Sequence, residues 1–290
     1  MESSKARGRL YALGPGLIAA TSFGISDTFS KMVFAEGGDV LTLSVSRGVV
    51  GLVIVFFYLR MGPPVVLGTP RTRAFGLGLG ALFAAIIFGL FKAIELLTAP
   101  VAVLTYFIYP LLTGIAAAIF GVERLGWQGV LAAIVAFFGL VLTIGANPQD
   151  LSIAGVAFAI GAALCRVAFL LIARTEMQGA DPRLSTWHSL LSSTAIFSLA
   201  ALVTMNWHMP HTNAGWIAVV IVCIGTAVAT LTLYMSAVRI GPFRSALIMN
   251  LEPLLVTILS APLLGEVITP IQALGGAIML GAIVAFQLRR

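Results

Sequence analysis

Two charges stand inside long apolar stretches of this 290-residue chain and are the first candidates for chemistry. Glu252 directly precedes Pro253, and a carboxylate in such a place can bind a substrate ammonium group or carry a proton. Arg166 has no charged residue three or four positions away. Because a guanidinium keeps its proton, Arg166 needs a carboxylate, either that of Glu252 or that of a substrate. The alternative for Glu252 is a structural ion pair with Arg166 or Arg239.

Five further charges lie near the outer ends of the first three apolar stretches: Asp27, Lys31, Arg47, Lys92 and Glu95. Asp27 and Lys31 are four residues apart, and Lys92 and Glu95 are three apart, so each pair can neutralise itself on one helix. Arg47 is then the cation that most needs a partner. The five residues predict a charged outer vestibule, with structural pairing and snorkelling to the membrane surface as the alternative.

Aromatic and amide side chains inside the apolar stretches complete the candidate substrate site. Such groups hold a substrate ring and offer one polar atom. Trp187 also fits an aromatic belt at the membrane surface, and His188 is either a proton site or a core histidine with satisfied hydrogen bonds. With Glu252, the candidate binding residues are Tyr106, Tyr109, Trp187, His188, Tyr234 and Asn250.

The elements that carry these residues are predicted to be membrane-spanning helices. Hydrophobic residues make up 59% of the chain and charged residues 10%, against roughly 45–50% and about 25% in soluble domains. The segments do not alternate apolar and polar residues, which argues against barrel strands. Ten stretches are long enough to span a bilayer: 11–34, 40–59, 74–97, 100–121, 127–146, 153–173, 184–204, 214–237, 244–264 and 270–288.

Basic residues in the joints predict the orientation of the chain. Lys and Arg occur at both termini and in every second joint, while the other five joints hold none. The positive-inside rule therefore places both termini in the cytoplasm, and we expect a multi-pass protein of the bacterial inner membrane. This distribution also accounts for the net charge of +6, and no basic stripe with interleaved aromatics indicates nucleic-acid binding.

The chain repeats itself at an offset of 143 residues. Pro110 recurs as Pro253, and Glu123 recurs as Glu266. The offset implies five spans in each half, and because five is odd the halves must have opposite orientations in the membrane. We therefore predict two inverted five-helix repeats, residues 1–147 and 148–290.

The repeated prolines predict a helix break in the fourth and ninth spans. Each proline lacks an N–H, which frees the carbonyl one turn earlier, at Tyr106 and Met249. In a membrane a free carbonyl needs a cavity, water or a neighbouring helix. Pro110 and Pro253 are therefore predicted to line a midplane site and to take part in gating, with a packing kink as the alternative.

Two long segments carry a family resemblance. "YPLLTGIAAAIFGVERLGWQGVLAAIVAFFGLVL" and "EPLLVTILSAPLLGEVITPIQALGGAIMLGAIVAF" resemble the two EamA-type halves of the drug/metabolite transporter superfamily. The pattern is a proline in the span, Gly-Glu at its end, and then a Gly-rich helix; Gly121-Val122-Glu123 departs from it by one residue. The resemblance implies ten helices around a central cavity and metabolite export. Within that superfamily the sequence looks most like bacterial amino-acid exporters, including the aromatic amino-acid exporter.

The sequence thus predicts a secondary transporter that exports small metabolites by alternating access, with aromatic or apolar amino acids as the first substrate class. Lipophilic cations are the alternative substrates, and an intramembrane enzyme is the rival class. No metal, cofactor or catalytic motif is present, so neither a cofactor nor an enzyme activity is expected. Gly76 and Gly80, and a small-residue face in the last span, leave open packing within one chain or a homodimer.

Overall fold

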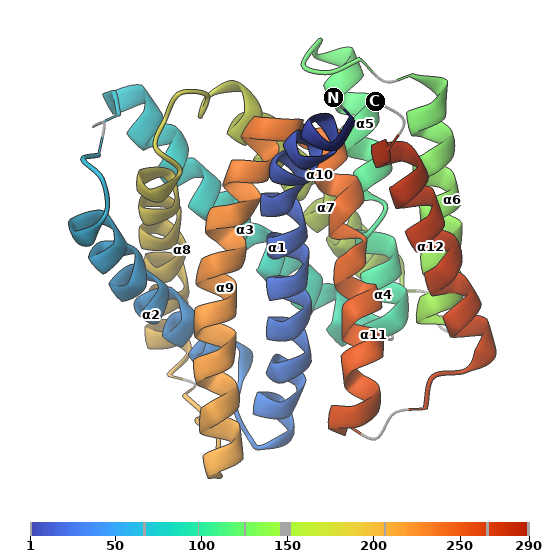
Figure 1. The fold of residues 1–290 in the computed structure, drawn as a ribbon. Coiled ribbons are helices and arrows are strands. Elements are labelled where there is room, and N and C mark those ends of the chain that lie inside the picture. Colours follow the sequence, from blue (N-terminus) through green and yellow to red (C-terminus); the bar gives the residue numbers. More distant parts are fainter. Residues whose placement is uncertain are drawn as a thin grey trace.

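The computed structural model describes residues 2–65, 68–97, 99–124, 126–145, 152–205, 207–264 and 267–288 (Figure 1). Glu266, the repeat partner of Glu123, and the predicted boundary between residues 147 and 148 lie outside these ranges. Within the ranges every regular element is a helix. In chain order the helices are α1 (Glu2–Ala35), α2 (Val40–Met61), α3 (Pro70–Leu96), α4 (Ala99–Tyr106), α5 (Tyr109–Ile119), α6 (Trp127–Ile144), α7 (Ile153–Thr175), α8 (Pro182–Thr204), α9 (Asn213–Ile240), α10 (Pro242–Met249), α11 (Leu251–Leu264) and α12 (Pro270–Leu288).

These helices form the ten crossings that the sequence predicts. Eight helical segments in the described chain are long and apolar enough to span a membrane, and α4 with α5, and α10 with α11, each make one of them. A shorter apolar helix, Pro270–Phe286, lies within α12. The remaining crossing is α1, which carries Asp27 and Lys31 and runs the height of the bundle (Figure 1).

The fourth and ninth crossings are interrupted just before their repeated prolines. α4 ends at Tyr106 and α5 begins at Tyr109, so that Pro110 is the second residue of α5. α10 ends at Met249 and α11 begins at Leu251. Because a proline has no N–H and crowds the preceding turn, the helix cannot continue with regular hydrogen bonds at these points.

The contacts between the two halves have the symmetry of an inverted repeat. α1 packs against α9 and α7 packs against α3; α2 packs against α9 and α8 packs against α3. α2 also contacts α8, and α6 contacts α12. If α1–α6 correspond in order to α7–α12, each of these contacts occurs together with its counterpart. A pseudo-twofold axis therefore relates the halves, and because each half crosses five times, the axis lies in the membrane plane.

The helix starts give the register of this repeat. α3 and α9, α4 and α10, and α6 and α12 each begin 143 residues apart, which is the offset of the repeated prolines. The start of α1 and the end of α12 lie at the same end of the bundle (Figure 1). We call this the terminus end and the other the outer end.

Asp39 joins the start of α2 to the segment before α9 at the outer end. It caps α2 by accepting hydrogen bonds from the backbone N–H of Leu41 at 2.8 Å and of Thr42 at 3.0 Å, and it also accepts from the Thr42 hydroxyl. The N–H of His208, in the segment before α9, donates to the same carboxylate at 2.7 Å. Burial alone would raise the pKa of Asp39, but the hydrogen bonds, those from Thr42 foremost, hold this pKa below its ordinary value.

Gly76 and Gly80 pack within the chain, against α8. A Cβ atom at Gly76 would lie 2.9 Å from the Cβ atom of His188, and one at Gly80 would overlap the carbonyl oxygen of Ser189. Their close approach therefore joins α3 to α8 and leaves no room for a second chain at this point.

Candidate functional site

A cavity of about 510 Å³ opens at the outer end of the bundle. Its rim comes from the last turns of α1, α3 and α6 and from the first turns of α2 and α12, all of which lie at that end (Figure 1). Phe34, Val40, Ile94, Ile144 and Gln272 are the rim residues. The volume falls within the roughly 300–1,000 Å³ of small-molecule sites.

Two carboxyl groups meet at the closed end of this cavity. Asp27 of α1 and Glu252 of α11 both line it, and their side chains interact electrostatically. Asp27 is accessible through the cavity, whereas the Oε2 atom of Glu252 is buried without a hydrogen-bond partner. Two neighbouring carboxylates repel each other, and a proton or another cation between them relieves this repulsion. The pair is therefore a place where one proton, or a substrate cation in its stead, can be held.

Two cations line the same cavity. Arg47 of α2 interacts electrostatically with Asp27 and lies over the ring of Phe83, 5.6 Å from its centroid; its Nη2 atom is buried without a hydrogen-bond partner. Lys31 donates a 3.2 Å hydrogen bond to the Ser260 hydroxyl on α11, and its charge also interacts with Asp27. The closed end thus presents carboxyl groups and a guanidinium side by side.

Aromatic rings form much of the wall. The break between α4 and α5 places Tyr106 and Phe107 at the cavity, with their rings edge to face and their centroids 5.3 Å apart. Phe34 and Phe91 add two further rings from α1 and α3. The wall is therefore apolar around a charged end, which suits a molecule with a polar head and an apolar body.

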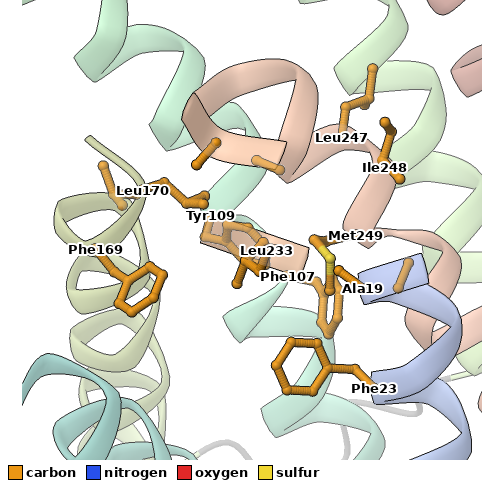
Figure 2. Close-up of a cluster of buried hydrophobic side chains, with 14 of the residues drawn as sticks. Ala19, Phe23, Phe107, Tyr109, Phe169, Leu170, Leu233, Leu247, Ile248 and Met249 are labelled. Carbon is orange, nitrogen blue, oxygen red and sulfur yellow. The ribbon is translucent and has the colours of Figure 1, made fainter. Parts of the chain in front are cut away.

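A cluster of buried hydrophobic side chains packs the bundle beside the cavity, and Figure 2 shows part of this cluster. Phe23 of α1, Phe107 from the α4–α5 break and Met249 of α10 belong to this cluster (Figure 2). We call the ten labelled residues of Figure 2 the inner cluster: Ala19, Phe23, Phe107, Tyr109, Phe169, Leu170, Leu233, Leu247, Ile248 and Met249.

Arg166 is buried against the inner cluster and does not reach the cavity wall. Its guanidinium lies 5.6 Å from the ring centroid of Phe23, 5.7 Å from that of Tyr109 and 6.0 Å from that of Phe169. Its Nε and Nη1 atoms have no hydrogen-bond partner. No ion pair joins Arg166 to Glu252 in the described part of the chain, although their charges interact. The guanidinium therefore contacts the faces of three aromatic rings in place of the expected carboxylate.

The structure brings only part of the predicted binding set to the cavity. Tyr106, Glu252 and Pro253 line it, together with the predicted charges Asp27, Lys31 and Arg47. Three other predicted residues are buried on the terminus side of it, outside its lining: Tyr109, Tyr234 and Asn250.

Four predicted residues lie elsewhere. Lys92 and Glu95 form their predicted ion pair at 2.6 Å, but on the exposed outside of the bundle. Trp187 is half-buried beside Phe56 of α2, with ring centroids 6.3 Å apart. The Nδ1 atom of His188 lies 2.8 Å from the carbonyl oxygen of Leu184, in the same helix. The polar groups of Lys92, Glu95 and His188 are thus engaged away from the cavity.

Several cavity residues were not singled out in the sequence. Ser30 and Phe34 of α1 follow Asp27 by three and seven positions, and Thr257 of α11 follows Glu252 by five. Residues three and seven positions apart share a helix face, so the spacing was a usable signal for Ser30 and Phe34, whereas the five-residue spacing of Thr257 was not. Phe107 and Thr143 carried no such signal.

Comparison with known proteins places the chain in a family. Residues 10–145 and 153–287 each match the EamA-like transporter family, which covers nearly the whole chain. No curated protein matches the chain. Among solved structures, 29 chains match. One of them is a crystal structure titled only "Crystal structure of protein", which superposes with a TM-score of 0.79 at 20% sequence identity and covers 96% of this chain and 99% of that one. This similarity supports the fold alone. With both inverted halves matched over ten membrane crossings, the chain belongs to the EamA-like transporter family, a family of drug- and metabolite-type membrane transporters.

Proposed function

We propose that this protein is a secondary carrier that exports small metabolites, with aromatic or apolar amino acids as the first class, by alternating access. The observation that carries the proposal is the outer cavity, which combines a carboxyl pair, a guanidinium and aromatic walls in one space. An amino acid has matching groups: an ammonium for Asp27 and Glu252, a carboxylate for Arg47, and a side chain for the rings.

The orientation of the cavity agrees with export. The joints that contain arginine are on the same side as the termini. The positive-inside rule places this side in the cytoplasm when the protein lies in a bacterial inner membrane. The cavity then opens on the far side, where an exporter releases its substrate. The breaks before Pro110 and Pro253 are the proposed hinges, because each supplies backbone freed from regular helix bonds beside the site.

The carboxyl pair favours coupling to protons. One proton bridging Asp27 and Glu252 must leave, or move aside, when a substrate ammonium takes its place. Each outward passage of substrate can then be exchanged for an inward proton. His188, the other proton site considered from the sequence, lies outside the cavity lining and is not part of this proposal.

Transport by the purified protein in proteoliposomes tests the proposal. Vesicles loaded with a labelled amino-acid panel should release apolar and aromatic members saturably and chemically intact. Arg47→Gln should weaken the apparent affinity by about 10–100-fold, because a hydrogen bond to a charged group is lost. Absence of saturable flux for every amino acid would contradict the proposal, and recovery of an altered product would support an intramembrane enzyme.

Lipophilic cations are the second candidate class, since a carboxyl pair and aromatic rings also suit them. Phenylalanine and its decarboxylated amine separate the two classes, because only the amino acid has a carboxylate for Arg47. Preferential transport of phenylalanine, lost in Arg47→Gln, supports the amino-acid assignment. Equal or better transport of the amine, unaffected by this substitution, would assign the protein to cations.

A further inference from the structure

Four buried polar side chains on the terminus side of the cavity have atoms without hydrogen-bond partners. They are Arg166 (Nε and Nη1), the hydroxyl groups of Tyr109 and Tyr234, and the Oδ1 atom of Asn250. All four residues are at least nine-tenths buried. Burying such a group unsatisfied costs about 1–3 kcal/mol, so the four call for a physical reason, even though interactions of Tyr109 with Arg166 and of Tyr234 with Ser189 offset part of this cost.

The inverted repeat gives such a reason, because residues of the cavity wall have counterparts in the other half of the chain. Phe91 of α3, Phe107 after α4 and Glu252 of α11 line the outer cavity. At the offset of 143 residues their counterparts are Tyr234, Asn250 and Tyr109. Three of the four unsatisfied side chains are thus the repeat counterparts of cavity residues.

The exposure of the side chains also differs between the two halves. Ser30, Ile94 and Val103 face the open cavity from α1, α3 and α4. Their second-half counterparts, Ala173, Ala237 and Ala246, are fully buried at 0% exposure. The inner cluster contains further counterparts of cavity residues: Leu170 for Asp27, Leu233 for Leu90, and Met249 for Tyr106 (Figure 2).

We propose that these residues form a second, cytoplasm-facing substrate vestibule, closed in this conformation, that takes the carboxylate end of the substrate at Arg166. The proposal rests on the carrier function proposed above. In the alternate conformation the two halves exchange their roles, the outer cavity closes, and Tyr109, Tyr234 and Asn250 gain water or substrate as hydrogen-bond partners.

The charges of the two vestibules differ, and this assigns the ligand chemistry. The carboxyl groups of the outer cavity, Asp27 and Glu252, have the uncharged counterparts Leu170 and Tyr109. The inner side instead holds Arg166, one turn before Leu170, and Arg174, the counterpart of Lys31. Arg174 now donates a hydrogen bond to the Val238 carbonyl oxygen, which ties α7 to α9 at the terminus end. Because the inner side holds arginines and these counterparts include no carboxylate, we assign it an anionic ligand group.

Cysteine labelling from each side of the membrane tests the vestibule. In a transport-competent background with Cys165 and Cys223 replaced by alanine, single variants Ala173→Cys and Ala237→Cys are exposed to a membrane-impermeant maleimide. We expect labelling from the terminus side, at about 0.1–10% of the rate at Ser30→Cys from the outer side if the inward-open form is a minor state.

Ala163→Cys is the matched control. Ala163 is fully buried in α7, as Ala173 is, but its counterpart Ala20 is also fully buried, so neither conformation exposes it. Active Ala173→Cys and Ala237→Cys proteins that label no faster than Ala163→Cys would overturn the vestibule while leaving the carrier function standing. If one reporter fails to fold, the other decides the outcome. Loss of the carrier function itself would appear as absent flux in the unmodified protein.

Arg166→Gln tests the ligand assignment. The apparent substrate affinity measured from the terminus side should weaken by about 10–100-fold for phenylalanine and much less for its decarboxylated amine. Equal effects on the two ligands would show that Arg166 has a structural role and does not bind the carboxylate.

Discussion

Replacing Glu252 by glutamine is the sharpest test of the outer site. Glutamine keeps the shape of the side chain but removes the charge, and with it the carboxyl pair with Asp27. The Oε2 atom of Glu252 is buried without a hydrogen-bond partner, and the residue lines the cavity, so the proposal gives this atom a substrate ammonium group as its partner. A hydrogen bond to a charged group contributes about 1.5–3 kcal/mol, which corresponds to about 10–150-fold in affinity. Because Asp27 remains, we expect an effect near the lower end, about tenfold.

The assay is efflux from proteoliposomes, with KM measured over a range of pH. In the unmodified protein protons compete with the ammonium group for the carboxyl pair, so the affinity should fall as the pH falls. Glu252→Gln should raise KM and flatten this pH dependence, because no second carboxyl group remains to share a proton.

Glu95→Gln is the matched control for this experiment. It makes the same chemical change, but Glu95 pairs with Lys92 on the exposed face of α3 and does not line the cavity. We expect transport like that of the unmodified protein. If Glu252→Gln has the same KM and the same pH profile as Glu95→Gln, the role assigned to the carboxyl pair is wrong.

Three further predictions concern packing, capping and the limits of the site. Gly80→Ala should destabilise the protein by about 1–3 kcal/mol relative to Gly78→Ala, whose Cβ meets nothing within 4 Å, and equal melting temperatures in detergent would contradict the close contact of α3 with α8. Asp39→Ala should cost about 0.5–2 kcal/mol through the lost cap. Because the pKa of Asp39 is lowered in the folded protein, its contribution is present above the ordinary carboxyl pKa and is lost as the pH falls through the lowered one, so the melting temperatures of Asp39→Ala and the unmodified protein should converge in acid. Trp187→Ala should leave substrate affinity from the outer side unchanged, since Trp187 lies outside the cavity; a large rise in KM would refute this placement.

The helices were predictable because the relevant information is local. An apolar run of about 20 residues crosses a bilayer whatever it packs against. The ten predicted stretches accordingly agree with the observed crossings within a few residues at most ends, apart from the earlier start of α1. The breaks before Pro110 and Pro253 are local too, since a proline removes a hydrogen bond of its own helix.

The residues of the site could be predicted from the sequence only where an ionisable side chain lies within an apolar stretch. Glu252 was identified because an ionisable group in a membrane is rare and costly. Its neighbour Asp27 lies 225 positions earlier, and the sequence offered Arg166 and Arg239 as partners instead. No spacing rule connects residues on α1 and α11, because the rotation of each helix about its axis depends on all its packing partners.

The sequence by itself determined ten apolar crossings, their breaks and an inverted repeat, and hence the symmetry of the bundle. Only the tertiary structure decided which half is open and which is packed. The repeat makes the two halves nearly equivalent, so the choice between them depends on the sum of many contacts across the bundle. That sum places Asp27 and Glu252 in a water-accessible cavity and buries their counterparts Leu170 and Tyr109 in the inner cluster.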